Sequence, residues 1–336
     1  MFAKWGVVFR TRNAIILFLI KYIMQGAVLQ IISMFLIMGL GLIFRIKSVL
    51  SDSTIRQINK FTIHYLFPSL FFVQIVGMDL VKVFNLRFIL AALTVLVATY
   101  LLSWGVASLL SKDRRRRVAA TQLIYVANLV VVGIPMVDSA FGNPQYNALA
   151  IVVLFFGLFF HNIIPITQFE LVTGSKESVG KIILRVFKNP IVASIIIAAV
   201  CNLLDMRIGF FKTYFAQFLL KPMSMLGHTA STMVFLCIGY NMHLKLNKSN
   251  IGILSAMAVV SLIVVPLVTY GLAMAFSLPH DLALVLTIMF ASPTAPYIYN
   301  IMMPYDLELD LTQHAVVVTM IGYLVTMPVI LMALGL

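Results

Sequence analysis

Long apolar runs alternate with short polar stretches along the whole chain. A helix needs about 20 mostly apolar residues to cross the hydrocarbon core of a membrane. Measured against that length, the sequence gives ten candidate spans, most of them joined by short connections. It therefore predicts an all-α polytopic membrane protein. The predicted spans are 27–44, 61–78, 86–110, 118–140, 147–169, 189–204, 214–238, 251–275, 282–303 and 311–335.

Composition supports this class. Hydrophobic residues make up 62% of the 336 and charged residues only 10%, with a mean hydropathy of +1.04. A soluble protein of this size could not cover so much apolar surface. The two cysteines, Cys201 and Cys237, lie in apolar runs and form no CxxC pair. They indicate packing residues, with no metal site or disulfide framework.

The excess of 24 Lys and Arg over 11 Asp and Glu, a net charge of +13, follows the membrane topology. Basic residues gather after the odd-numbered spans, as in the run from Arg114 to Arg117, and cytoplasmic loops carry such an excess. We therefore expect a cell (inner or cytoplasmic) membrane protein with both termini outside. The run is interpreted as a topology anchor that also contacts lipid headgroups, with no nucleic-acid partner.

Four parts follow from the span pattern. Residues 24–171 hold the first five spans, 172–188 form a cytoplasmic loop, and 189–336 hold the second five spans. Residues 1–23 are an N-terminal extension with four basic residues around a short apolar run, but no small-residue cleavage site follows. Either Met24 is the functional start or this extension lies on the membrane surface.

The ninth span is interrupted by Pro293 and Pro296, which bracket Thr294 and follow Ser292. In hydrocarbon every backbone N–H and C=O needs a partner, so irregular backbone at membrane depth must be buried in protein or line a polar cavity. A simple proline kink is the alternative. The clustering of prolines with polar residues favours a binding site.

The fourth span is weakened in the same way, by Gly133 and Pro135 after Asn128. If the ten spans divide into two sets of five, the fourth span corresponds to the ninth and the second to the seventh. The second and seventh spans hold prolines at matching places, Pro68 and Pro222. Interrupted spans at matching places in two halves are typical of transporters built from inverted repeats, with the substrate site at the breaks.

Several segments in this order resemble the auxin efflux carrier family over residues 24–336: LQIISMFLIMGLGLIFR, ANLVVVGIPMVDSAFG, KNPIVASIIIAAV, FLCIGYNM and ASPTAP. The resemblance implies a secondary transporter of two inverted five-helix repeats, in which broken helices 4 and 9 cross. It also implies a homodimer that moves small organic anions by an elevator-like mechanism. Ser292-Pro293-Thr294 replaces the Asn-Pro-Asn of plant carriers, and the central loop is short, which resembles the prokaryotic branch with its malonate and malate carriers.

The site chemistry can be predicted from the residues. A half-helix that begins at the crossing presents partial positive charge and free N–H groups to a carboxylate. We predict Asn128 as a direct donor, with Ser292 and Thr294 opposite it. An interhelical hydrogen bond without any ligand is the alternative for Asn128. The remaining candidates are a second layer of Tyr125, Tyr297 and Asn300, and the helix-break residues Gly133, Pro135, Pro293 and Pro296.

A coupling ion is left open between a proton and sodium. His161 is a candidate for the proton because histidine titrates near neutral pH, and Asp138 is the second candidate. A packing histidine and a water-facing aspartate are the alternatives. No cluster of carboxylates and amides indicates a sodium or metal site.

Motifs of soluble enzymes are absent: the sequence has no Walker loop, HExxH or GxSxG. We therefore expect no enzyme activity and no cofactor. The leading hypothesis is a carrier for a small carboxylate, and a ligand sensor or channel with the same fold is the alternative.

Overall fold

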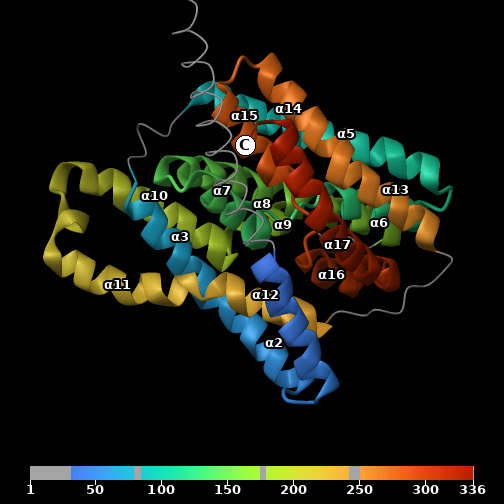
Figure 1. The fold of residues 1–336 in the computed structure, drawn as a ribbon, viewed down its shortest axis with the longest axis horizontal. Coiled ribbons are helices and arrows are strands. Elements are labelled where there is room, and N and C mark those ends of the chain that lie inside the picture. Colours follow the sequence, from blue (N-terminus) through green and yellow to red (C-terminus); the bar gives the residue numbers. More distant parts are fainter. Residues whose placement is uncertain (1–31, 79–84, 175–178, 242–249, 336) are drawn as a thin grey trace, which may run out of the picture.

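The computed structural model describes residues 32–78, 85–174, 179–241 and 250–335, and the regular elements in these ranges are helices (Figure 1). The predicted N-terminal extension, 1–23, lies outside the described residues, as does the start of the first predicted span. The remaining spans can be compared with the helices directly.

Four helices are long and apolar enough to cross a membrane without interruption. They agree with the predicted spans to within a few residues, and two of them, 86–110 and 251–275, agree at both ends. The four are α5 (Leu86–Leu110), α8 (Pro144–Thr173), the run Ile251–Ala275 and α17 (Leu309–Ala333). The run Ile251–Ala275 consists of α13 (Ile251–Val259), a π-helical turn (Val260–Val264) and α14 (Val265–Ala275).

The other predicted spans correspond to shorter or divided helices. The stretch expected as a loop, 172–188, differs from the prediction because it contains helix α9 (Val179–Phe187). The shorter helices are Ile32–Ile46, α2 (Asp52–Phe61) continued by a π-helical turn (Thr62–Leu66) and α3 (Phe67–Val76), α10 (Pro190–Ile208), α11 (Tyr214–His228) and α12 (Ala230–Asn241).

Three prolines are accommodated by π-helical turns. The turns end at Leu66, Gly133 and Val264, in each case two residues before a proline. Proline lacks the N–H for an i→i−4 bond and its ring clashes with the preceding turn. A π turn inserts one residue and widens the helix at that place, so each helix continues past its proline.

The fourth and ninth predicted spans are broken, and each break separates two helices. In the fourth span α6 (Arg114–Tyr125) ends before Val126, and a π-helical turn (Leu129–Gly133) then leads into α7 (Ile134–Phe141). In the ninth span α15 (His280–Phe290) ends before the prolines and α16 (Tyr297–Met302) follows them.

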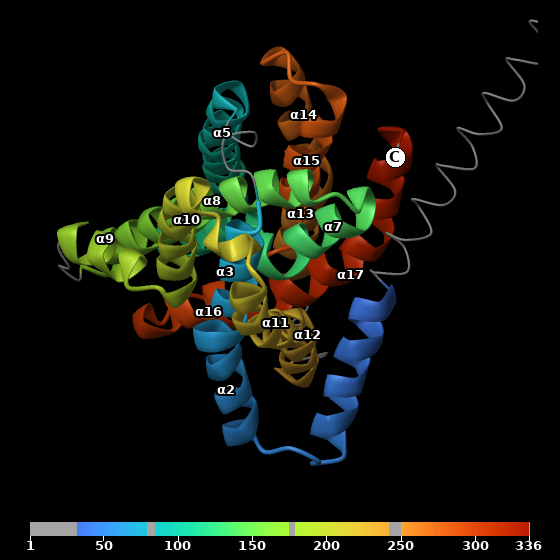
Figure 2. The ribbon, with the colours of Figure 1, turned by 90° about the vertical axis from the view of Figure 1, so that its left-hand side faces the viewer.

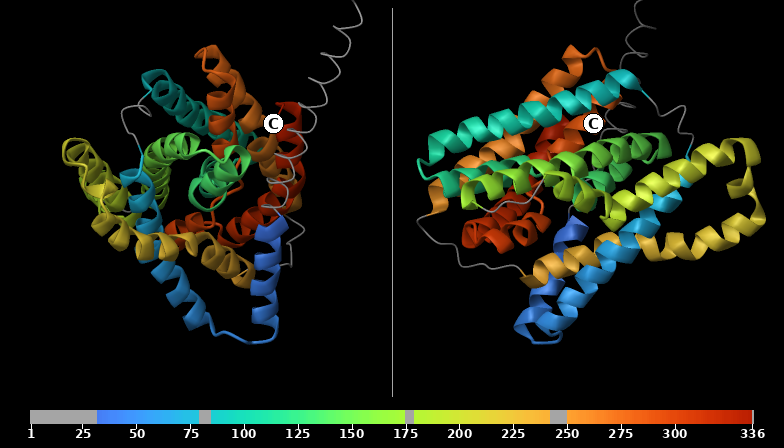
Figure 3. Two further views of the ribbon diagram at one scale, coloured as in Figure 1. Left: turned by 60° about the vertical axis from the view of Figure 1, so that its left-hand side comes forward. Right: turned by 180° about the vertical axis from the view of Figure 1, so that it is seen from behind.

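The helices form two groups. In one group α3 packs against α10 and α11 (Figure 1), and the Ile32–Ile46 helix and α2 project from one end of the molecule (Figure 2). In the other, α5 packs against α6 and α14, α14 against α15, and α13 against α17 (Figure 3). The two broken spans belong to the second group.

Two arginines of the basic run hold the ends of other spans. The Arg115 guanidinium donates to the backbone carbonyls of Tyr305, at 3.1 Å, and Asp306, at 3.2 Å. Arg116 donates to Oδ1 of Asn250, the residue before α13, at 2.6 Å. The run therefore ties the start of α6 to the ends of the eighth and ninth spans, which the prediction of a topology anchor did not anticipate.

Candidate functional site

The two breaks pair with each other through their backbones. The Asn128 N–H donates to the Pro293 carbonyl at 2.8 Å, and the Ala295 N–H donates to the Val126 carbonyl at 2.9 Å. Ala127 and Thr294 thus form an isolated antiparallel bridge. Backbone groups freed at one break are satisfied at the other, as burial in an apolar environment requires. The predicted meeting of the fourth and ninth spans at their interruptions is therefore present, and we call this paired region the crossing.

Thr294 fixes the crossing to two further helices. Its N–H donates to Oγ1 of Thr319 on α17 at 3.1 Å, and its own hydroxyl donates to the Leu123 carbonyl near the end of α6 at 2.7 Å. Ser292 donates to the Ile288 carbonyl of its own span at 3.3 Å. Both hydroxyls that the sequence predicted as ligand groups therefore direct their protons at backbone carbonyls.

Asn128 differs from these hydroxyls because half of its amide is unused. The side chain is 3% exposed, and its Oδ1 accepts the Val131 N–H at 3.3 Å as an N-cap. Its Nδ2 has no hydrogen-bond partner among the described residues. The cap fixes which end of the amide faces the helix. A buried donor is thus left at the crossing, as the prediction for Asn128 requires.

The helix-break residues allow the two spans to approach closely. A Cβ added to Gly133 would lie 2.9 Å from Sδ of Met289 and 3.2 Å from Oγ of Ser292, so glycine fits there best. Pro135 follows the π-helical turn in the fourth span. Pro293 supplies the carbonyl that pairs with Asn128, and Pro296 directly precedes α16.

Tyr125, His161 and Tyr297 lie together beside the crossing. The rings of Tyr125 and His161 meet edge to face with centroids 4.7 Å apart, and the Tyr297 hydroxyl donates to the His161 carbonyl at 3.3 Å. Tyr125 is 2% and His161 1% exposed. Within the described part of the chain, the Tyr125 hydroxyl and Nε2 of His161 have no partner.

Two predicted site residues are not brought into this group. Asp138 is exposed near the far end of α7 and accepts a hydrogen bond from Nδ2 of Asn147 at 2.5 Å. A coupling role for Asp138 stays a prediction. Asn300 lies in α16, but its side chain is outside what the structure describes.

A chain of amides and a phenol next to Tyr125 was missed. Gln122 donates through Nε2 to Oε1 of Gln168 at 2.6 Å, and Gln168 donates to the Tyr100 hydroxyl. The rings of Tyr100 and Tyr125 lie 5.5 Å apart. Gln122 and Tyr125 are three residues apart, and His161 and Gln168 seven apart. Both spacings put polar side chains on one helix face. From this spacing the chain of amides and a phenol could have been predicted.

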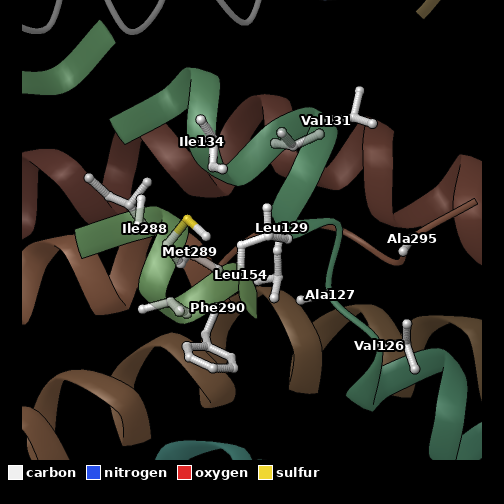
Figure 4. Close-up of a cluster of buried hydrophobic side chains, with 14 of the residues drawn as sticks. Val126, Ala127, Leu129, Val131, Ile134, Leu154, Ile288, Met289, Phe290 and Ala295 are labelled. Carbon is white, nitrogen blue, oxygen red and sulfur yellow. The ribbon is translucent and has the colours of Figure 1, made fainter. Parts of the chain in front are cut away.

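The surroundings of the crossing are apolar and without basic side chains. Figure 4 shows Leu129, Leu154, Met289 and Phe290 among the buried side chains beside the two breaks. The sequence has no Lys or Arg in residues 118–174 or 249–336, which include the fourth, fifth, eighth, ninth and tenth spans apart from the start of α6. Any anion bound there must be held by neutral donors and helix ends.

Apolar helices that can cross a membrane, with two of the spans broken and paired inside the protein, define the class of multi-pass membrane transporters. A family model described as membrane transport protein matches residues 26–180 and 173–331, which together cover nearly the whole chain. The chain belongs to this family, that of the auxin efflux carriers, and the predicted resemblance is confirmed. Its members are transporters and not enzymes. A comparison with curated proteins gives no match.

Proposed function

We propose that the protein is a secondary transporter for a small organic anion, a carboxylate, which binds at the crossing. Membership of a transporter family supports the transport step. The observation that carries the substrate class is the buried Asn128 amide, whose Nδ2 donor has no partner among the described residues. A buried donor without a partner costs free energy unless a ligand accepts its proton.

The local backbone adds to the attraction for an anion. The helical stretch Leu129–Phe141 begins directly after Asn128, so its N-terminus lies at the crossing. A helix N-terminus is equivalent to roughly +0.5 of a charge, and hydrogen bonds to a charged group contribute about 1.5–3 kcal/mol each. Neutral donors of this kind can hold a carboxylate without a buried Lys or Arg.

Packing between spans supports the proposed architecture of ten spans in two inverted five-helix repeats. The third span packs on the fourth as the eighth packs on the ninth, through α5 with α6 and α14 with α15. The second span packs on the sixth, through α3 with α10. In the equivalent pair, Gly41 of the first span lies against the backbone of α12 in the seventh.

From these pairs we propose an elevator-like movement of the group that holds the crossing against the other group. The protein would work as a homodimer in the cell membrane with both termini outside. The charge distribution of the sequence supports that orientation, because the proposed cytoplasmic connections hold most of the basic residues.

The first test replaces the donor but keeps the cap. Serine caps a helix about as well as asparagine, so Asn128→Ser retains the acceptor for the cap. It removes the two amide hydrogens and leaves one hydroxyl proton on a side chain too short to reach the position of Nδ2. We expect this variant to keep wild-type thermal stability to within a few degrees and to lose stabilisation by carboxylates. Asn143→Ser is the matched control, because Asn143 caps α8 through the Gln145 N–H at 2.9 Å at an exposed position. Equal carboxylate responses in both variants would exclude Asn128 as a binding group.

The second test separates transport from binding alone. Purified protein in liposomes loaded with unlabelled carboxylate should take up labelled carboxylate faster than in empty liposomes. Binding without this counterflow would indicate a ligand sensor, and uptake that does not respond to the internal substrate would indicate a channel.

A further inference from the structure

Tyr323 on α17 carries a second buried polar group that the proposed site has not used. The residue is 1% exposed and is among the largest fully buried side chains. Its hydroxyl has no hydrogen-bond partner within the described residues. Phenylalanine would fill the same space without a polar atom to satisfy, so the hydroxyl has no evident value for packing.

The position of Tyr323 along α17 places it beside the crossing. Thr312 donates to Sδ of Met302 on α16 at 3.1 Å, and Thr319 accepts the N–H of Thr294 at 3.1 Å. These contacts show which face of α17 covers the broken ninth span. Tyr323 is four residues beyond Thr319 and belongs to that face. At about 1.5 Å rise per residue, it lies about 6 Å further along the helix.

The two halves of the chain contribute comparable groups. The fifth span, α8, brings His161, whose ring contacts Tyr125 at the end of α6. The tenth span, α17, brings Tyr323 one turn beyond the threonine that holds the ninth-span break. Each is almost fully buried and has a polar atom without a partner in the described part of the chain. The last span of each half therefore offers one uncommitted polar group near the crossing.

We propose that Tyr323 is a substrate-binding residue whose hydroxyl donates to the carboxylate that Asn128 holds. This inference rests on the proposed function. A carboxylate has two oxygens with about four acceptor sites in total, so it can accept from the Asn128 amide and from a phenol on the side of α17. A phenol is also a suitable donor in an apolar site because it stays neutral near pH 7.

The test is Tyr323→Phe, assayed by thermal shift and isothermal titration with acetate, benzoate, malonate and succinate. Without ligand, the variant should melt at the wild-type temperature or above it, because a buried unsatisfied group has been removed. The carboxylate that stabilises wild-type protein most should bind about 10- to 100-fold more weakly, as expected for a lost hydrogen bond to a charged group. A merely structural tyrosine would not give this combination.

Tyr240→Phe is the matched control. Tyr240 lies on α12, outside the group of helices that holds the crossing. Its hydroxyl donates to the Leu50 carbonyl and to Oδ1 of Asp52, both at 2.9 Å. This control should melt at a lower temperature and bind the carboxylate with wild-type affinity. The two tyrosines should thus respond in opposite ways.

Two results would overturn the inference alone. They are wild-type affinity in Tyr323→Phe while Asn128→Ser has lost it, and loss of ligand-free stability in Tyr323→Phe comparable to that of the control. If none of the four carboxylates stabilises wild-type protein, the proposed function itself fails and this inference fails with it.

Discussion

The stability of the crossing can be tested at Thr319, a residue that does not belong to either broken span. Its hydroxyl donates to the Ala315 carbonyl of its own helix at 2.7 Å and accepts the N–H of Thr294 at 3.1 Å. Thr319→Val preserves the shape of the side chain and removes every hydrogen bond of its hydroxyl. The Thr294 N–H then has no acceptor in a buried, apolar place, while the rest of the crossing is unchanged.

A second buried threonine serves as a control that isolates the hydrogen bond between Thr294 and Thr319. Thr99 on α5 donates to the Val95 carbonyl at 2.7 Å and the Leu96 carbonyl at 3.2 Å, within its own helix. Thr319 makes the same two intrahelical bonds, at 2.7 and 3.3 Å. Thr99→Val therefore removes everything that Thr319→Val removes except the bond from another span. The difference between the two variants measures the support that α17 gives to the crossing.

The expected difference follows from the cost of a buried N–H without an acceptor, about 1–3 kcal/mol. For a chain of 336 residues, 1 kcal/mol lowers Tm by roughly 1–2 °C. Thr319→Val should therefore melt about 1–6 °C below Thr99→Val when both are purified in the same detergent. It should also bind carboxylates more weakly, because the break that presents Asn128 is held less firmly. Equal melting temperatures would refute the argument that this bond stabilises the crossing.

Two further predictions concern the packing and the orientation of the spans. Gly239→Ala should destabilise the protein by about 1–3 kcal/mol, because the new Cβ would lie 1.8 Å from the Met38 carbonyl oxygen and must separate two helices. Gly105→Ala, where no atom lies within 4 Å of the new Cβ, should be neutral or slightly stabilising in the same melting assay. Alkaline phosphatase fused after Leu336 and expressed in bacteria should be active, since we place the C-terminus outside. An inactive phosphatase fusion, together with fluorescence from green fluorescent protein fused at the same position, would contradict this orientation.

Much of the fold could be predicted because the membrane sets the length and composition of each span. The span predicted at 86–110 and α5 have the same ends, and the breaks near Asn128 and Pro293 were predicted from proline, glycine and polar residues in apolar runs. Helix α9 was missed because Val179–Phe187 is an amphipathic segment of 9 residues, far shorter than the about 20 residues by which a span was recognised. The role of Arg115 was missed because its partners, the carbonyls of Tyr305 and Asp306, lie far away in the sequence.

The site was harder to predict because a polar residue at a helix break can satisfy either the backbone or a ligand. Ser292 and Thr294 were predicted to bind the substrate, but their hydroxyls donate to carbonyls freed or exposed near the breaks. Buried backbone groups take the nearest available partners, and the sequence does not show how near they are. Gln122 and Tyr323 were missed because a single polar residue in an apolar span resembles ordinary packing.

The chemistry of the side chains explains why Asn128, rather than a serine or threonine, is left with a free donor. A hydroxyl has one proton, and once that proton is given to a carbonyl the group can only accept. An asparagine amide has an acceptor at one end and two donor hydrogens at the other. At position 128 the acceptor end caps the helix, and the donor end is buried without a partner among the described residues. A single residue can therefore stabilise the break and bind an anion, whereas Ser292 and Thr294 can only stabilise it once their protons are used.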